Sequence, residues 1–346
     1  MGTPLESRQN SMTLCPTGPS RWRRRRRDAV LLVARRTAVA VPIVVAVSLG
    51  VFLLSAFSPF DPLIAFLGDR VQNVSLDERR RMAASLGLDK SWWESWLIWV
   101  EALARGDLGH SRVYRQPVAE VFAQRLPWTM LLSGVGIVLG SVISVVMGVR
   151  AGLRPGSWSD RIATTFAVLL GALPSYVVSL GAIMIFSLGL GLFPTGGLSR
   201  PGDPITAAGV ALHVTLPAVV LGLSLVPWLL LSVRASVHET VRSEAVAGAV
   251  ARGIPPRTIV RAHILPVSLA PVVTLLGTRL PELVVGAVIV EEIFAWPGLA
   301  QATVSSAQQL DFALLSALTI ATTLLVLLGS LLADAIYLFL DPRVTP

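Results

Sequence analysis

Residues Glu244–Pro266 read EAVAGAVARGIPPRTIVRAHILP and lie between two long apolar segments. Small residues at helical spacing precede Gly253, which stands where a C′ glycine would end a helix. Pro255 and Pro256 force a turn and favour the start of a second helix. The small side chains make the first helix thin, and the second helix is basic. The stretch therefore predicts a structured surface in water that fits a partner molecule. The alternative is an inert amphipathic linker resting on lipid.

The rest of the chain has the composition of a membrane protein. It is 53% hydrophobic and 14% charged, with mean hydropathy +0.68, whereas soluble domains carry about 25% charged residues. Uninterrupted apolar runs of about 18 residues or more indicate transmembrane helices when they lack the alternating pattern of barrel strands. We therefore predict an all-α integral membrane fold with six transmembrane helices, from the runs 37–57, 129–149, 162–190, 205–233, 267–290 and 312–340.

Arginine is distributed unevenly between the two sides of these helices. Eighteen basic residues fall on the side of the two termini, including the run Arg23–Arg27, against ten on the other side. Basic loops stay in the cytoplasm, so we expect a multi-pass protein of the inner (plasma) membrane with both termini cytoplasmic. The arginine run is better explained by anionic lipid than by nucleic acid.

The same pattern divides the chain into parts. We predict a basic, disordered cytoplasmic tail, then one span and a long extracytoplasmic segment. The remainder would be a helical core that contains the cytoplasmic loop. The predicted bounds are 1–36 for the tail, 37–57 for the first span, 58–127 for the outer segment, 128–346 for the core and 234–266 for the loop.

The sequence offers no basis for an enzyme. A P-loop needs a lysine after a glycine, and the only lysine, Lys90, follows an aspartate. The four histidines show no metalloprotease spacing, and no G-x-S-x-G elbow is present. The single cysteine, Cys15, excludes a disulfide within the chain and a cysteine metal cluster. We expect no catalytic residue, no metal site and no cofactor bound by this chain.

A few features within or beside the apolar runs could line a pathway. Arg279 and Glu282 are three residues apart in the fifth run and share a helix face. Charges inside a membrane usually face a bundle interior or water. Together with Pro174 and Ser175 in the third run, they are candidates for a translocation pathway. For Arg279 and Glu282 the alternative is a structural ion pair.

The outer segment contains a tryptophan-rich stretch, SWWESWLIWVEALA, from Ser91 to Ala104. Tryptophan is enriched at membrane interfaces, which favours a helix lying on the bilayer surface. Packing inside a small outer cap is an equally good explanation, and the sequence leaves the choice open.

The stretch 244–266 resembles the EAA loop of ABC importer permeases, with Gly253 at the loop's glycine and Leu265–Pro266 at its Leu-Pro. Two positions depart from the pattern: Ala247 replaces a glutamate and His263 an isoleucine. Further segments resemble the dipeptide, oligopeptide and nickel branch of that family, and they run in order from about Arg35 to Arg343. They read GDLGHS, QRLPWTMLL, ALPSYVVSL, LFPTGG, TLPAVVLGLSL, VVGAVIVEEIFAWPGL and DPR.

This resemblance implies a type I ABC importer permease fold with an extended outer segment between helices 1 and 2, similar to the first permease of such systems. It implies four kinds of partner: a second homologous permease, ATP-binding subunits that hydrolyse ATP, an extracytoplasmic solute-binding protein and the bilayer. The implied cargo is short peptides, with nickel complexes or another small solute as the alternative. The loop would couple to the ATPase through Ala247, Gly248, Arg252, Gly253, Arg257, Leu265 and Pro266.

Two other classes of function remain open at this point. An ion-gradient-driven secondary transporter would also be a helical bundle, but inverted repeats and a carboxylate network at the midplane are missing from the sequence. A membrane enzyme or scaffold is the third class. Copurification with ATPase subunits would distinguish an ABC importer permease from both of these classes.

Overall fold

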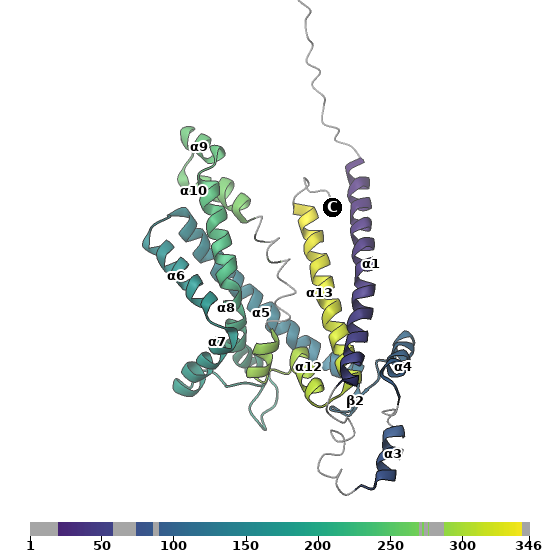
Figure 1. The fold of residues 1–346 in the computed structure, drawn as a ribbon. Coiled ribbons are helices and arrows are strands. Elements are labelled where there is room, and N and C mark those ends of the chain that lie inside the picture. The colour runs from purple at the N-terminus through teal and green to yellow at the C-terminus, as the bar shows by residue number, and fades with distance from the viewer. Residues whose placement is uncertain are drawn as a thin grey trace, which may run out of the picture.

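The computed structural model describes residues 20–57, 74–85, 90–269, 272, 276 and 287–340, with the backbone alone at 20–33, 55, 76, 79, 85 and 332–340. Within these residues the protein is mainly helical (Figure 1). The longer helices are α1 (Ser20–Ala56), α5 (Val118–Leu153), α6 (Trp158–Ala172), α8 (Ala207–Val241) and α13 (Phe312–Leu340). The shorter ones are α3 (Leu76–Ser85), α4 (Trp92–Ala104), α7 (Ser175–Ala182), α9 (Glu244–Ala251), α10 (Pro256–Ile259) and α12 (Leu299–Gln308).

Four of the described helices are long and apolar enough to cross a membrane: Ala34–Leu54 within α1, the whole of α5 and α8, and Phe312–Leu331 within α13. They correspond to the first, second, fourth and sixth apolar runs, which confirms those four predictions. The fifth run, 267–290, lies mostly outside the described residues, and Arg279 and Glu282 lie there with it.

The third apolar run is not one continuous helix but a bent pair of helices, which is either one broken span or a re-entrant loop. Helix α6 ends at Ala172, and α7, which continues as the π-helix η2 (Ile183–Gly189), leaves it at an angle of 102°. Leu173 between them is extended, with φ −94° and ψ 124°, because a following proline disfavours the helical conformation. Pro174 therefore produces the bend.

Two predicted boundaries also move. Helix α1 begins at Ser20, so the prediction of a disordered tail is wrong for residues 20–36. Helix α5 begins at Val118 and passes through Pro127 without ending. The expected boundary between the outer segment and the core, at 127/128, therefore falls inside a helix.

The core of the bundle is the pairing of α5 with α8 along a series of small residues on α5. Gly136, Gly140, Ser144, Gly148 and Gly152 recur every fourth residue and are all buried. Small residues at this spacing allow two helix backbones to approach closely in a membrane. A Cβ on Gly140 would lie 2.5 Å from the carbonyl oxygen of Gly222 in α8, so the two helices pack with their backbones in contact.

The outer segment is fixed to the start of α13 by a buried carboxylate. Asp311 is 1% exposed, and its Oδ2 accepts hydrogen bonds from Ser111 Oγ at 2.7 Å and from the backbone N–H of Arg112 at 2.7 Å. Ser111 belongs to a two-stranded hairpin, β1 (His110–Ser111) and β2 (Gln116–Pro117). The contact holds residues 200 positions apart together.

The two ends of the molecule differ in what they carry. Figure 1 shows α9 and α10 at the same end as the start of α1 and the last turns of α13. Helices α3 and α4 and the hairpin lie at the opposite end. The loop 234–266 and the basic start of α1 therefore share one side of the bundle, as expected from the distribution of arginine.

Candidate coupling surface and pathway

Helix α9 is a short helix with well-formed ends that follows α8 directly. The Ser243 side chain accepts a hydrogen bond from the backbone N–H of Val246 and caps the start of the helix. At the other end, Gly253 has φ +71° and donates its N–H to the Val250 carbonyl at 2.9 Å. Ile254 N–H donates to the Ala249 carbonyl at 3.2 Å. These two bonds form a Schellman motif, which confirms the predicted glycine stop.

The second helix follows as predicted but contains a π turn. Pro255 is the N-cap and Pro256 occupies the first position of α10. Helix α10 continues into the π-helix η3 (Val260–Ile264) and then into helical residues 265–269. Ser268 Oγ donates to Thr240 Oγ1 of α8 at 3.0 Å. This bond ties the returning helix to the one that leads into the loop.

An apolar cluster holds α9 and η3 against the end of α8 and leaves the opposite faces exposed. The cluster includes Val237 of α8, Val246 and Ala249 of α9, and Ile259 and Ile264. The predicted coupling residues lie on the outside of this packed unit. Ala247, Gly248, Arg252, Gly253, Arg257 and Pro266 are exposed, and Leu265 is half-buried. Six of the seven predicted coupling residues are thus exposed on a segment that an apolar cluster packs against α8.

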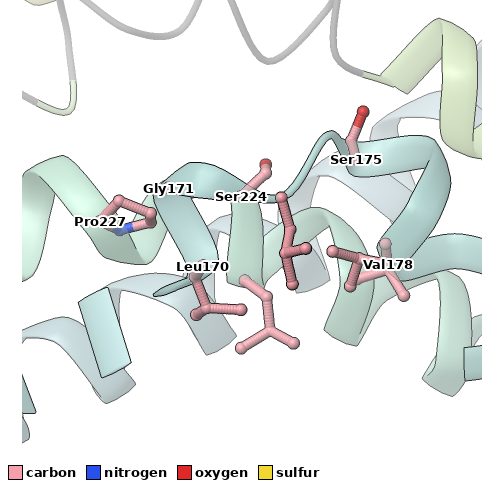
Figure 2. A pocket seen from close by; sticks show the side chains of 9 residues that line it. Leu170, Gly171, Ser175, Val178, Ser224 and Pro227 are labelled. Carbon is pink, nitrogen blue, oxygen red and sulfur yellow. The ribbon is translucent and has the colours of Figure 1, made fainter. Parts of the chain in front are cut away.

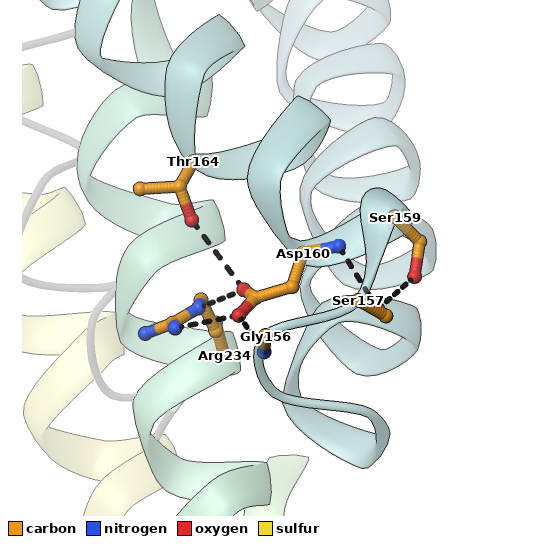
Figure 3. Close-up of polar contacts among 6 residues, drawn as sticks. All are labelled: Gly156, Ser157, Ser159, Asp160, Thr164 and Arg234. Carbon is orange, nitrogen blue, oxygen red and sulfur yellow. Dashed lines mark hydrogen bonds and ion pairs between the residues drawn. The ribbon is translucent and has the colours of Figure 1, made fainter.

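Sequence reasoning missed an ion pair that joins α6 to α8. Asp160, near the start of α6, accepts two hydrogen bonds from the guanidinium of Arg234 in α8, from Nε and, at 2.9 Å, from Nη2. Asp160 also accepts from the backbone N–H of Gly156 at 2.8 Å. Figure 3 shows the pair joining the start of α6 to the last part of α8. Local sequence carries no signal for it, since its partners are 74 residues apart.

Loss of the Asp160 carboxylate is expected to loosen the attachment of the α5–α6 turn to α8. The Asp160 side chain is 6% exposed and that of Arg234 is 32% exposed. Removing one partner of such a charge-assisted pair should lower the free energy of unfolding by about 1–3 kcal/mol. Asp160→Ala should therefore lower the melting temperature of the purified protein.

A double-mutant cycle with Arg234→Gln tests this expectation directly. The double variant should be little less stable than Asp160→Ala alone, because either single change breaks the same contact. Arg154→Gln, an exposed arginine in the same turn, is the control and should leave the melting temperature unchanged. Additive losses from the two single changes would show that the pair contributes nothing.

The bend between α6 and α7 borders a cavity of 270 Å³. It is lined by Leu170, Gly171, Leu173, Ser175, Val178, Val220, Leu223, Ser224 and Pro227, and Figure 2 shows Ser175 and Ser224 among the apolar side chains that surround it. Of the predicted pathway residues, Ser175 lines this cavity and Pro174 produces the bend beside it. Arg279 and Glu282 lie outside the described residues, so the structure does not test their pairing with the bend.

A second buried carboxylate organises the end of the bundle opposite α9. Glu291 is fully buried and accepts from Thr129 Oγ1 of α5 at 2.7 Å and from the N–H groups of Ala300 and Gln301 at 2.9 and 3.1 Å. It therefore caps the start of α12, where Gly298 has no side chain to do so. Glu291 is the first residue of the motif EEIFAWPGL, but the residue spacing of the motif does not by itself predict this capping role.

The geometry defines a class of protein: a membrane-spanning helical bundle with a capped, exposed helical unit at one end and a bent helix bordering a cavity. Within the described part of the chain, no three His, Cys, Asp or Glu side chains gather to hold a metal ion. Residues 140–346 match the family model of the binding-protein-dependent transport system inner membrane component. The chain belongs to this family, and it is a permease component of a binding-protein-dependent transport system.

Several relatives extend the match over most of the chain. The oligopeptide transport system permease protein AppB of Bacillus subtilis is 32% identical over 314 residues, which cover 90% of this chain and 98% of the relative. The dipeptide transport system permease protein DppB of Escherichia coli K12 is 26% identical over 333 residues, with the same two coverages. A solved structure, the MetNI methionine ABC transporter in inward-facing conformations, has a similar fold. Its TM-score is 0.52 at 19% identity, covering 64% of this chain and 97% of that chain.

Proposed function

We propose that this permease forms half of a pathway for short peptides, next to a second, homologous permease. A binding protein would deliver the peptide, and separate ATP-binding subunits would bind and hydrolyse ATP. The peptide assignment is supported by the relatives named as oligopeptide and dipeptide permeases, which the chain covers almost completely. In this assembly the chain would bind no cofactor itself.

The observation that carries the coupling proposal is the exposed unit formed by α9 and α10. Its inner face packs on α8, so a force applied to the outer face would reach the bundle without being absorbed by a flexible loop. The outer face combines small side chains with Arg252 and Arg257. Such a surface suits a groove with acidic groups on a neighbouring subunit. We infer that the protein lies in the inner (plasma) membrane, with the α9–α10 end and both termini in the cytoplasm.

The proposed pathway runs past the bend between α6 and α7. Broken helices in transporters lie beside the transported solute, because the break exposes backbone groups and requires a cavity. Ser175 and Ser224 supply hydroxyl groups to an otherwise apolar lining. A mostly apolar lining with two hydroxyl groups is appropriate for a conduit, which has to release what it passes. Arg279 and Glu282 are proposed to contribute charge from the fifth run.

Deletion of this permease is expected to abolish uptake of a labelled di- or tripeptide, and the gene supplied in trans should restore it. The measurement is the initial rate of uptake in whole cells, with nickel uptake measured in parallel. Metal-ligating residues in the permease do not decide between peptide and nickel as its cargo, since a binding protein would hold the metal. Loss of nickel uptake alone would therefore overturn the peptide proposal and leave the permease assignment intact. Uptake that persists when the partner ATPase is inactivated would indicate an ion-driven carrier.

A further inference from the structure

Helix α4 in the outer segment packs only one of its faces against the bundle. Trp96 Nε1 donates to Ser48 Oγ of α1 at 3.0 Å, and the ring of Trp99 lies 5.9 Å from that of Phe52 between centroids. Ile320 of α13 completes this cluster. The sequence left interface helix and outer cap as alternatives, and these contacts show that part of the tryptophan-rich stretch does pack on the protein.

The contacts with α1 also fix the depth of α4. Ser48 lies six residues before Leu54, the last residue of the apolar span in α1. At 1.5 Å per residue, this places the Trp96–Ser48 bond about 9 Å inside the end of the span. Figure 1 agrees, because α4 lies beside the last turns of α1 and not beyond them. Helix α4 is therefore level with the outer turns of a transmembrane helix.

Away from these contacts, α4 exposes three apolar side chains together with the Glu101–Arg105 pair. Trp93, Leu97 and Ile98 are 48%, 50% and 46% exposed. At the same end, Leu54 of α1 and Phe57, just after α1, are 71% and 77% exposed. The exposed apolar side chains of α4 therefore lie at the same end of the bundle as those of a helix long and apolar enough to cross the membrane. Water would be an unfavourable neighbour for such an area.

The charged groups of α4 have partners at the residues that cap its two ends. Glu94 accepts hydrogen bonds from Ser91 N–H at 2.9 Å and Ser91 Oγ at 2.7 Å. Glu101 pairs with Arg105 one turn later. Polar groups bonded at the two ends of the helix, with tryptophan and apolar side chains between them, suit a helix at the boundary between headgroups and acyl chains.

We propose that α4 lies within the outer leaflet of the bilayer, with Trp93, Leu97 and Ile98 in contact with lipid acyl chains and the Glu101–Arg105 pair among the headgroups. The helix would hold the outer segment to the membrane beside α1. This role is independent of the transported solute and of the coupling surface.

Spin labels on the assembled transporter in phospholipid nanodiscs test the proposal. Single cysteines are introduced in a Cys15→Ser background, and collisions with oxygen, which concentrates in lipid, are compared with collisions with a water-soluble nickel chelate. Leu97→Cys should favour oxygen, as should Val41→Cys, which is 59% exposed within the span of α1. Ala84→Cys on the exposed side of α3 should favour the nickel chelate. Ile98→Cys is the replacement if Leu97→Cys does not assemble.

Two outcomes would overturn the proposal. A label at position 97 that collides with the nickel chelate as freely as the label at position 84 would place α4 in water. A label at position 97 that is shielded from both reagents would mean that protein covers this face. Repeating the measurement with and without the binding protein would then show whether that protein is the cover.

Discussion

Gly140→Leu is expected to prevent the protein from folding. A Cβ at this position would lie 2.5 Å from the Gly222 carbonyl oxygen and 3.1 Å from a methyl carbon of Leu225. Because the nearest atom belongs to backbone, no change of rotamer relieves the contact, and the two helices have to separate. Separating α5 from α8 loses the central packing of the bundle. We expect a loss of about 3 kcal/mol or more, enough to remove most folded protein from the membrane.

The matched control for this change is Gly134→Leu. Gly134 lies on the same helix, but no atom comes within 4 Å of a Cβ built there. The two variants thus add the same side chain to the same helix on different faces. The measurement is the yield of monodisperse protein after detergent extraction, followed by its melting temperature. Equal yields from the two variants would mean that α5 and α8 do not pack through their backbones.

The coupling unit could be predicted from the sequence because the signals that shape it are local. A glycine followed at once by two prolines specifies a helix end and a helix start, whatever surrounds them. Gly253 and Pro256 both occupy the positions expected of them. The same reasoning should have detected the bend at Pro174, since a proline within an apolar run disfavours a helical residue before it. The apolar run 162–190 is long enough for one membrane-spanning helix, and its length was given more weight than the proline within it.

The features that sequence reasoning missed depend on residues far apart in the chain. Asp160 and Arg234 are each unremarkable in their own segments, and only the packing of α6 on α8 brings them together. The same holds for Glu291 with Thr129 and for Asp311 with Ser111. One available signal was overlooked: the small residues at every fourth position of α5 are visible in the sequence and indicate a closely packed helix pair.

Gly253→Glu is expected to uncouple the transporter while leaving the permease inserted and folded. No atom lies within 4 Å of a Cβ at this position, and the residue is exposed. The substitution therefore adds bulk and a negative charge directly to the coupling surface. The backbone at φ +71° also strains any residue with a Cβ, by about 1 kcal/mol. We expect binding of the ATPase subunits and peptide uptake to fall together, to a small fraction of the unsubstituted rates.

Two further variants separate the surface effect from the backbone strain. Gly253→Asn keeps the left-handed conformation at lower strain and adds no charge, so it should retain most of the uptake. Gly202→Glu introduces the same side chain at φ +91°, also with no atom within 4 Å of the added Cβ, but in a turn outside the coupling unit. It should retain ATPase binding. If Gly253→Glu copurifies with its ATPase and transports normally, α9 and α10 are not the coupling surface. If Gly202→Glu loses ATPase binding as well, strain alone explains the effect at Gly253.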